Sequence, residues 1–189
     1  MFLMTEEGHI YDDYLPDVFG EARKALTRQS VTMSEDELQE RVDTALHEAA
    51  HLFAAGRRHA SVQEVCLPSP SMARQTGVCG GVHSAERWSR DAAFVHLVGY
   101  AWEELHGDVT RARNDWAAGQ QEARDADVPF DDLLAEARDF ARRADRSIRW
   151  VAMDILAALP KHGVIKGAKL RRIYGPVVEL AQEPAAYLP

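Results

Sequence analysis

Two histidines and a glutamate at fixed spacing are the residues of this sequence with the clearest chemical capacity. His47, Glu48 and His51 form a His-Glu-x-x-His motif. In a helix, residues four apart lie on one face, about 6 Å apart along the axis. Both imidazoles can therefore point at one zinc ion, and Glu48, about 100° around the helix, lies where it can deprotonate a bound water. The motif predicts a zinc centre with Glu48 as general base.

The surroundings of the motif are uncharged and small or apolar, which indicates a core-facing helix. Burying two imidazoles and a carboxylate costs free energy unless a partner satisfies them, and a metal ion would do so. The alternative is two histidines on a helix face beside a surface glutamate. The uncharged neighbours are Leu46, Ala49, Ala50, Leu52, Phe53 and Ala54.

A catalytic zinc usually has three protein ligands and leaves the fourth position to water. None of the other candidate histidines follows at the short spacing of the metzincin pattern; they are His59, His83, His96, His106 and His162. We therefore expect a carboxylate ligand from the helices after Ser84. The candidates are Glu103, Glu104, Asp108 and Asp115.

Hydrophobic periodicity predicts the elements that position these residues. Ser34 followed by Glu37 is typical of a capping box, and apolar residues at helical spacing continue until Gly56. Two period-two or glycine-rich runs predict strands at Ser61–Leu67 and Gly77–His83. The further predicted helices are Val18–Thr27, Ser84–Leu105, Asn114 to about Ala126, Asp131 to about Leu159 and Lys166–Tyr174. The expected fold class is mainly α (α+β), with a small β element between the motif helix and the next helix.

The composition is that of a folded protein of about one domain. The chain has 189 residues, of which 46% are hydrophobic and 28% charged, with a formal net charge of −8. The negative charge disfavours non-specific nucleic-acid binding. No apolar run reaches the roughly 20 residues of a membrane helix, and two cysteines are too few for a disulfide framework. We therefore expect no membrane partner and a cytoplasmic location.

Several segments together resemble a known family. Leu46–His51 is similar to the His-Glu-Ala-Gly-His helix of FtsH-type zinc metallopeptidases, with Ala50 in place of the usual glycine. Ala101–Leu105, Gly107–Thr110 and Asn114–Asp115 resemble the family's Ala-x-Glu-Glu-Leu, Gly-x-x-Thr and Asn-Asp segments. The resemblance runs from about residue 37 to 124. It implies a zincin-like helical peptidase domain at 34–180, an N-terminal extension at 1–33 packed on it, and a C-terminal tail at 181–189.

The resemblance also implies a third ligand and a substrate. The family's aspartate ligand corresponds to Asp115. The sequence contains neither a phosphate-binding Gly-x-x-x-x-Gly-Lys-Ser/Thr motif nor a membrane anchor. We therefore expect a stand-alone peptidase domain that acts on peptides or unfolded segments.

The glycine-rich run offers a candidate substrate site. A peptide strand could add to an exposed edge at Gly80, Gly81 and His83, because glycines allow a close approach of the backbone. A plain hairpin explains the same glycines equally well.

The sequence as a whole predicts a zinc-dependent, ATP-independent metallopeptidase that cleaves peptides or unfolded protein. Zn²⁺ is the expected cofactor and no nucleic-acid partner is expected; the oligomeric state is left open. The alternative is a non-catalytic, zinc-stabilised binding or regulatory module that kept the peptidase fold. Glu48 favours the enzyme, because a purely structural zinc site needs no general base.

Overall fold

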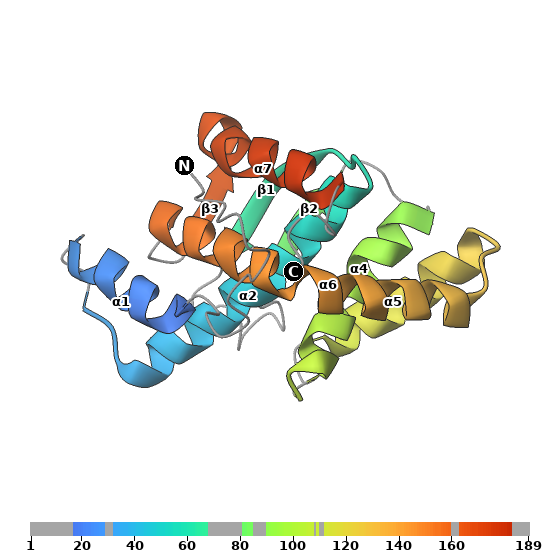
Figure 1. Cartoon of the computed structure of the whole chain (residues 1–189), viewed down its shortest axis with the longest axis horizontal. Coiled ribbons are helices and arrows are strands. Elements are labelled where there is room, and N and C mark those ends of the chain that lie inside the picture. Colours follow the sequence, from blue (N-terminus) through green and yellow to red (C-terminus); the bar gives the residue numbers. More distant parts are fainter. Residues whose placement is uncertain are drawn as a thin grey trace, which may run out of the picture.

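Helices dominate the architecture. The computed structural model describes residues 17–28, 32–67, 81–84, 90–107, 109, 112–159 and 163–182, with the backbone alone for 81–84. These residues form six helices and one small antiparallel sheet (Figure 1). The predicted fold class, mainly α with a small β element after the motif helix, is confirmed at this level.

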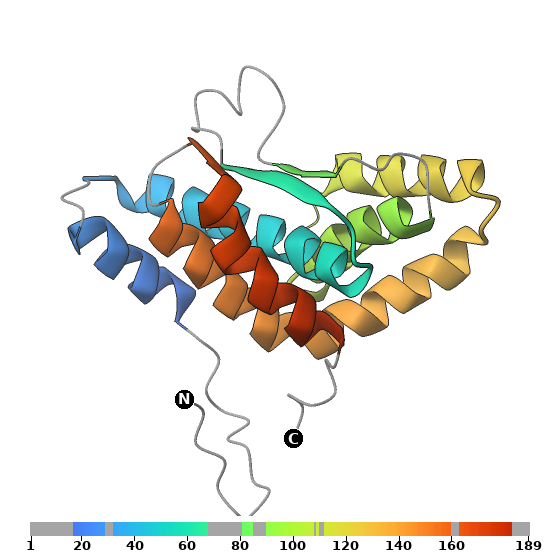
Figure 2. The ribbon, with the colours of Figure 1, turned by 90° about the horizontal axis from the view of Figure 1, so that it is seen from above.

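The motif helix α2 (Glu35–Arg57) lies at the centre of the molecule. It begins as predicted: the Ser34 hydroxyl accepts a hydrogen bond from the Glu37 amide, and the Glu37 carboxylate accepts one from the Ser34 amide. From Leu38 onwards most of its side chains are buried. In Figure 2, strand β1 lies along one side of α2 and the long helix α6 (Phe130–Ala158) along the other.

The sheet has three strands in the order β2-β1-β3. The central strand β1 (Val62–Leu67) pairs antiparallel with β2 (Gly81–Ser84) on one side and with β3 (Gly163–Lys166) on the other. Val65 and Ile165 are opposite each other in this register and are fully buried. The sheet therefore buries one face of β1 and β3 in the same core as α2.

The remaining helices occupy the two ends and one side of this centre. α1 (Val18–Arg28) packs against α6 and α2 at one end of the long axis, and α5 (Arg113–Asp125) packs against α4 (Arg90–Leu105) at the other (Figure 1). α7 (Gly167–Gln182) packs against α2.

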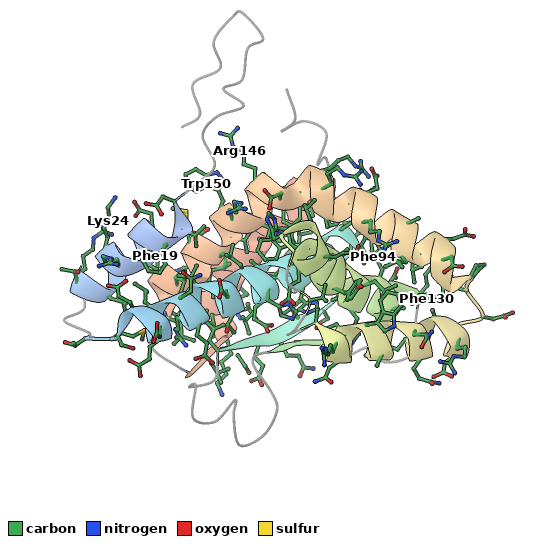
Figure 3. All side chains as sticks on the ribbon, turned by 90° about the horizontal axis from the view of Figure 1, so that it is seen from below. Phe19, Lys24, Phe94, Phe130, Arg146 and Trp150 are labelled. Carbon is green, nitrogen blue, oxygen red and sulfur yellow. The ribbon has the colours of Figure 1, made fainter. Side chains whose placement is uncertain are left out.

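Aromatic contacts join the helices at the α4–α5 end. The ring of Phe94 on α4 meets that of Phe140 on α6, with centroids 5.4 Å apart, and Phe130 meets Trp116 of α5 at 4.9 Å. Figure 3 shows Phe94 and Phe130 at this end of the molecule, whereas Trp150 projects from the outer side of α6. Trp150 is 45% exposed, so α6 is amphipathic and not buried all round.

A buried arginine connects three elements near the start of α2. Arg41 is 6% exposed and donates to the carbonyl of Leu67 at the end of β1 and to that of Leu159 at the end of α6. The side chain thus satisfies carbonyls that the two elements leave free at their ends. Burial lowers the pKa of Arg41 to about 10.

Two predicted boundaries were wrong, and one strand was missed. Ser84 ends strand β2 instead of opening a helix, and the described part of the next helix starts at Arg90. β3 was missed, because its four residues gain their hydrogen bonds from β1, a hundred positions earlier. α7 continues through Pro176 to Gln182, beyond the predicted helix end at Tyr174 and into the predicted tail at 181–189.

Packing explains the longer helix. Val177 and Ala181 continue the buried stripe of Leu170 and Ile173, and Val177 lies against Gly56 of α2. Burial of this stripe offsets the local cost of the proline. The predicted extension at 1–33 is described only in part, and its helix α1 contacts the rest of the fold.

Candidate metal centre

The structure brings together the three residues that were expected to hold a metal ion. His47 and His51 lie one turn apart on α2, and their Nε2 atoms are 3.0 Å apart. Asp115, in the first turn of α5, places Oδ2 at 3.1 Å from His47 Nε2 and Oδ1 at 3.6 Å from His51 Nε2. Ligands of a tetrahedral zinc ion are separated by about 3.3 Å, given zinc–ligand distances of about 2.05 Å. The residues therefore fit a zinc site of two nitrogens and one oxygen.

Partners on α4 fix the orientation of both imidazoles. His51 Nδ1 donates to the carbonyl oxygen of Val95 at 2.9 Å, and His47 Nδ1 lies 2.8 Å from Glu103 Oε1. Each partner is an acceptor, which keeps the proton of the imidazole on Nδ1 and leaves Nε2 unprotonated, with a lone pair available to a metal ion. Two such lone pairs then face each other and the carboxylate of Asp115. Only a cation, a proton or a metal ion, makes this arrangement favourable.

Glu103 also anchors the helix that carries Asp115. Its second oxygen, Oε2, accepts a hydrogen bond at 3.0 Å from the amide of Ala112, which precedes α5. No side chain caps α5 at Ala112 itself. Glu103 thereby ties the start of α5 to His47, and the negative charges of Glu103 and Asp115 are favourable at a helix N-terminus.

A glycine lets α4 approach the histidines. A Cβ atom built on Gly99 would lie 2.3 Å from Cε1 and 2.6 Å from Nε2 of His51. Any larger residue would displace the imidazole, so the absence of a side chain at this position is part of the site.

Glu48 is enclosed beside the cluster. It is 1% exposed, and its Oε2 atom has no hydrogen-bond partner among the described residues. Burial raises the pKa of Glu48, while the neighbouring His47 and His51 act in the opposite direction. A carboxylate with a raised pKa is better suited to accept and return a proton than an ordinary surface glutamate.

Charges within the cluster control the protonation of its other members. Burial alone would lower the pKa of His47, but hydrogen bonds to Asp115 and Glu103 raise it to about 10. Burial likewise opposes the ionisation of Asp115, but His51, His47 and His96 hold the pKa of this carboxyl well below its usual range. Asp115 is therefore an anion at neutral pH, as a metal ligand has to be.

Two residues near the cluster were not singled out from the sequence. His96 was one of five histidines considered as the third ligand and was given no role, and Glu122 was not considered. His96 Nδ1 lies 2.9 Å from Asp115 Oδ1, and His96 Nε2 lies 3.8 Å from Glu122 Oε1. Helical spacing was an available signal, because residue 122 follows residue 115 by two turns, and residue 96 lies two turns before Glu103.

The other candidates have different positions. Glu103 contacts His47 Nδ1 and not the ligand nitrogens. Glu104 forms an ion pair with Arg138 at 2.6 Å, on the outside of α4. Asp108 and Gly80 lie outside the described residues.

Gly81 and His83 belong to the backbone of β2. They pair with Cys66 and Glu64 of β1. β2 is an edge strand of the described sheet, and peptide binding at this edge stays a prediction.

In comparisons with known proteins, no protein-family model, no curated protein and no solved structure matches this chain. The resemblance to FtsH-type peptidases therefore stays a prediction from the sequence. None of the described helices combines the length and the apolar character that crossing a membrane requires.

Proposed function

We propose that this protein is a zinc-dependent, ATP-independent metallopeptidase. The observation that carries the proposal is the cluster of His47, His51 and Asp115 with the enclosed carboxylate of Glu48 next to it. The three ligands leave one position of a tetrahedral ion for water, as catalytic zinc sites do.

Each residue of the site has a separate task. When bound, zinc would lower the pKa of a coordinated water and polarise a carbonyl group. His47 and His51 would hold the ion through Nε2, and Asp115 would contribute the negative charge. Glu48 accepts the proton of the attacking water and returns it to the leaving amine, a role that its raised pKa supports.

Peptides are the substrate class that the fold supports best. β2 is an edge strand of the described sheet, and an extended peptide could pair with its outer edge near Gly80, Gly81 and His83. The resemblance to the FtsH-type peptidase domain points to the same class of substrate.

One observation favours a second candidate, a non-catalytic zinc-stabilised module. The side chains of His47, His51 and Asp115 are only 9%, 7% and 16% exposed. A site this enclosed also suits a structural metal.

Zinc content and peptide hydrolysis distinguish the two. Purified without a metal-binding tag, the wild type should contain about one zinc per chain, and Asp115→Ala very little. Glu48→Gln should keep the metal and lose hydrolysis of a peptide library by at least about 100-fold, because the general base is removed.

Glu104→Ala is the matched control, since Glu104 lies on the neighbouring helix and pairs with Arg138. It should keep both zinc and activity. Loss of zinc in Glu104→Ala but not in Asp115→Ala would overturn the ligand set. A wild type that binds zinc but cleaves no peptide would favour the structural module.

A further inference from the structure

A third histidine contacts the cluster from outside the motif. His96 lies on α4, and its Nδ1 atom is 2.9 Å from Oδ1 of Asp115. Its ring meets the ring of His51 edge-on, with centroids 6.0 Å apart. The His96 side chain is 35% exposed, whereas that of Asp115 is 16% exposed. His96 is therefore the more exposed side chain of this pair.

A second carboxylate faces the other side of the same imidazole. Glu122 lies two turns after Asp115 on α5, so that both project from one face of that helix. Its Oε1 atom is 3.8 Å from His96 Nε2, and its Oε2 atom is buried without a hydrogen-bond partner among the described residues. The imidazole of His96 is thus placed between two carboxylates of α5, with one ring nitrogen towards each.

The two oxygens of Asp115 have different neighbours. Oδ1 is at hydrogen-bond distance from His96 and 3.6 Å from Nε2 of His51, whereas Oδ2 lies closer to a ligand nitrogen, 3.1 Å from Nε2 of His47. A hydrogen bond donated to one oxygen fixes the rotation of a carboxylate and leaves the other oxygen as the better metal ligand.

We infer that His96 is a positioning residue for the metal centre: oriented by Glu122, it holds Oδ1 of Asp115 and leaves Oδ2 for the ion. This inference rests on the proposed function, because it assigns a role towards the same metal. With it, each of the three ligands has one partner on α4: Glu103 for His47, the Val95 carbonyl for His51, and His96 for Asp115. Such partners typically change metal affinity by about 10- to 100-fold when removed.

Two replacements of His96 separate its hydrogen bond to Asp115 from the space that its side chain fills. Asparagine places its amide nitrogen near the position of Nδ1 and can still donate to Asp115, whereas glutamine places it near Nε2 and cannot. His106→Gln is the matched control. His106 directly follows α4, and its Nε2 atom lies 2.8 Å from Oδ1 of Asp145, an aspartate that is not one of the proposed ligands.

The measurement is the zinc dissociation constant, obtained by competition with a chromophoric chelator, together with the visible spectrum of the cobalt-substituted protein. His96→Gln should weaken zinc binding by about 10- to 100-fold, His96→Asn by less than about threefold, and His106→Gln not at all. Circular dichroism confirms that each variant is folded. Glu122→Ala should weaken zinc binding in the wild-type background and have no further effect in His96→Gln.

Each outcome separates this inference from the proposed function. Wild-type affinity and an unchanged cobalt spectrum in His96→Gln, with zinc lost in Asp115→Ala, would overturn the positioning role and leave the proposed ligands intact. If both His96 variants lost zinc as completely as Asp115→Ala, His96 would be a metal ligand, and its assignment as a positioning residue would be overturned. A wild type that binds no zinc would overturn both proposals.

Discussion

At the scale of single residues, the three side chains of the centre can lie this close together only when a cation, a proton or a metal ion, lies between them. The Nε2 atoms of His47 and His51 and the carboxylate of Asp115 all offer lone pairs within 3.6 Å of one another. Acceptors on α4 keep the protons of both imidazoles on Nδ1. A proton on His47 and a metal ion therefore compete for the same space, which makes the stability of the protein depend on pH.

The stability of the chelator-treated protein should fall as pH rises. Hydrogen bonds to Asp115 and Glu103 raise the pKa of His47 from the ordinary value of 6.5 to about 10 in the folded chain. The stabilisation from its proton is complete below pH 6.5 and is lost as pH rises through about 10. Zinc affinity should change in the opposite direction over this range, by up to about tenfold per pH unit, since the competing proton leaves.

Thermal unfolding at pH 6.5, 8 and 9.5, with chelator and with zinc, measures both effects. The chelator-treated protein should melt at a lower temperature at pH 9.5 than at pH 6.5, and the stabilisation by zinc should grow with pH. His47→Gln should remove most of the dependence in chelator. A chelator-treated wild type that gains stability towards pH 9.5 would contradict this assignment of the proton.

At the scale of elements, α4 is the helix that orients the ligands of α2. The two helices run antiparallel: the His47 contact on α4 is at Glu103, and the His51 contacts are at Gly99 and Val95. A step of one turn along α2 thus corresponds to a step of one to two turns back along α4. The close approach that this requires is possible because position 99 has no Cβ.

Gly99→Ala should therefore damage the metal site more than the fold. The new methyl group would overlap the His51 imidazole, since its ideal position lies 2.3 Å from Cε1. We expect a loss of stability of about 1–3 kcal/mol and zinc binding weakened by at least about tenfold, because a ligand is displaced.

Gly119→Ala is the control for this prediction. Its Cβ would lie 2.8 Å from the Leu97 side chain, at the α4–α5 contact and away from the ligand nitrogens. It should lower the unfolding temperature but keep zinc affinity within about threefold. Denaturant unfolding and chelator competition measure the two quantities, and equal losses of affinity in both variants would refute the steric argument.

At the scale of the whole molecule, the centre connects α5 directly to α2, two helices that otherwise pack on α4 and make few contacts with each other. α5 buries only Gly119 and Ala123 fully and packs mainly on α4, whereas α2 is buried along most of its length. Asp115 brings α5 to the histidines of α2, and Glu103 ties the start of α5 to α4. A metal ion bound at the proposed site would therefore join α5 to α2 and stabilise this packing.

Removal of zinc should loosen α5 selectively. In hydrogen exchange followed by mass spectrometry, amides of Arg113–Asp125 should exchange at least about tenfold faster in chelator than in zinc, because local opening no longer breaks metal bonds. Peptides from the middle of α6 should change little. Asp115→Ala should exchange like the chelator-treated protein with or without zinc; equal acceleration in α5 and α6 would instead indicate global destabilisation.

Much of the fold and of the site could be predicted from local patterns. The capping box at Ser34, the helix that carries His47, Glu48 and His51, and the pairing of the two strands after it follow from spacing within a few residues. β3 could not be predicted in this way, because its pairing partner lies a hundred residues away. The continuation of α7 through Pro176 depends on the burial of Val177 against α2.

The sequence by itself determined the motif and the face of α2 on which it lies, because 3.6 residues per turn place positions 47 and 51 one above the other. It left four carboxylates as possible third ligands, and only the resemblance favoured Asp115. The tertiary structure brought Asp115 to the two histidines, made Glu103 the partner of His47 and revealed His96, Glu122 and Gly99. These contacts arise where α2, α4 and α5 pack together, and the distances between helices depend on side-chain packing that no local pattern encodes.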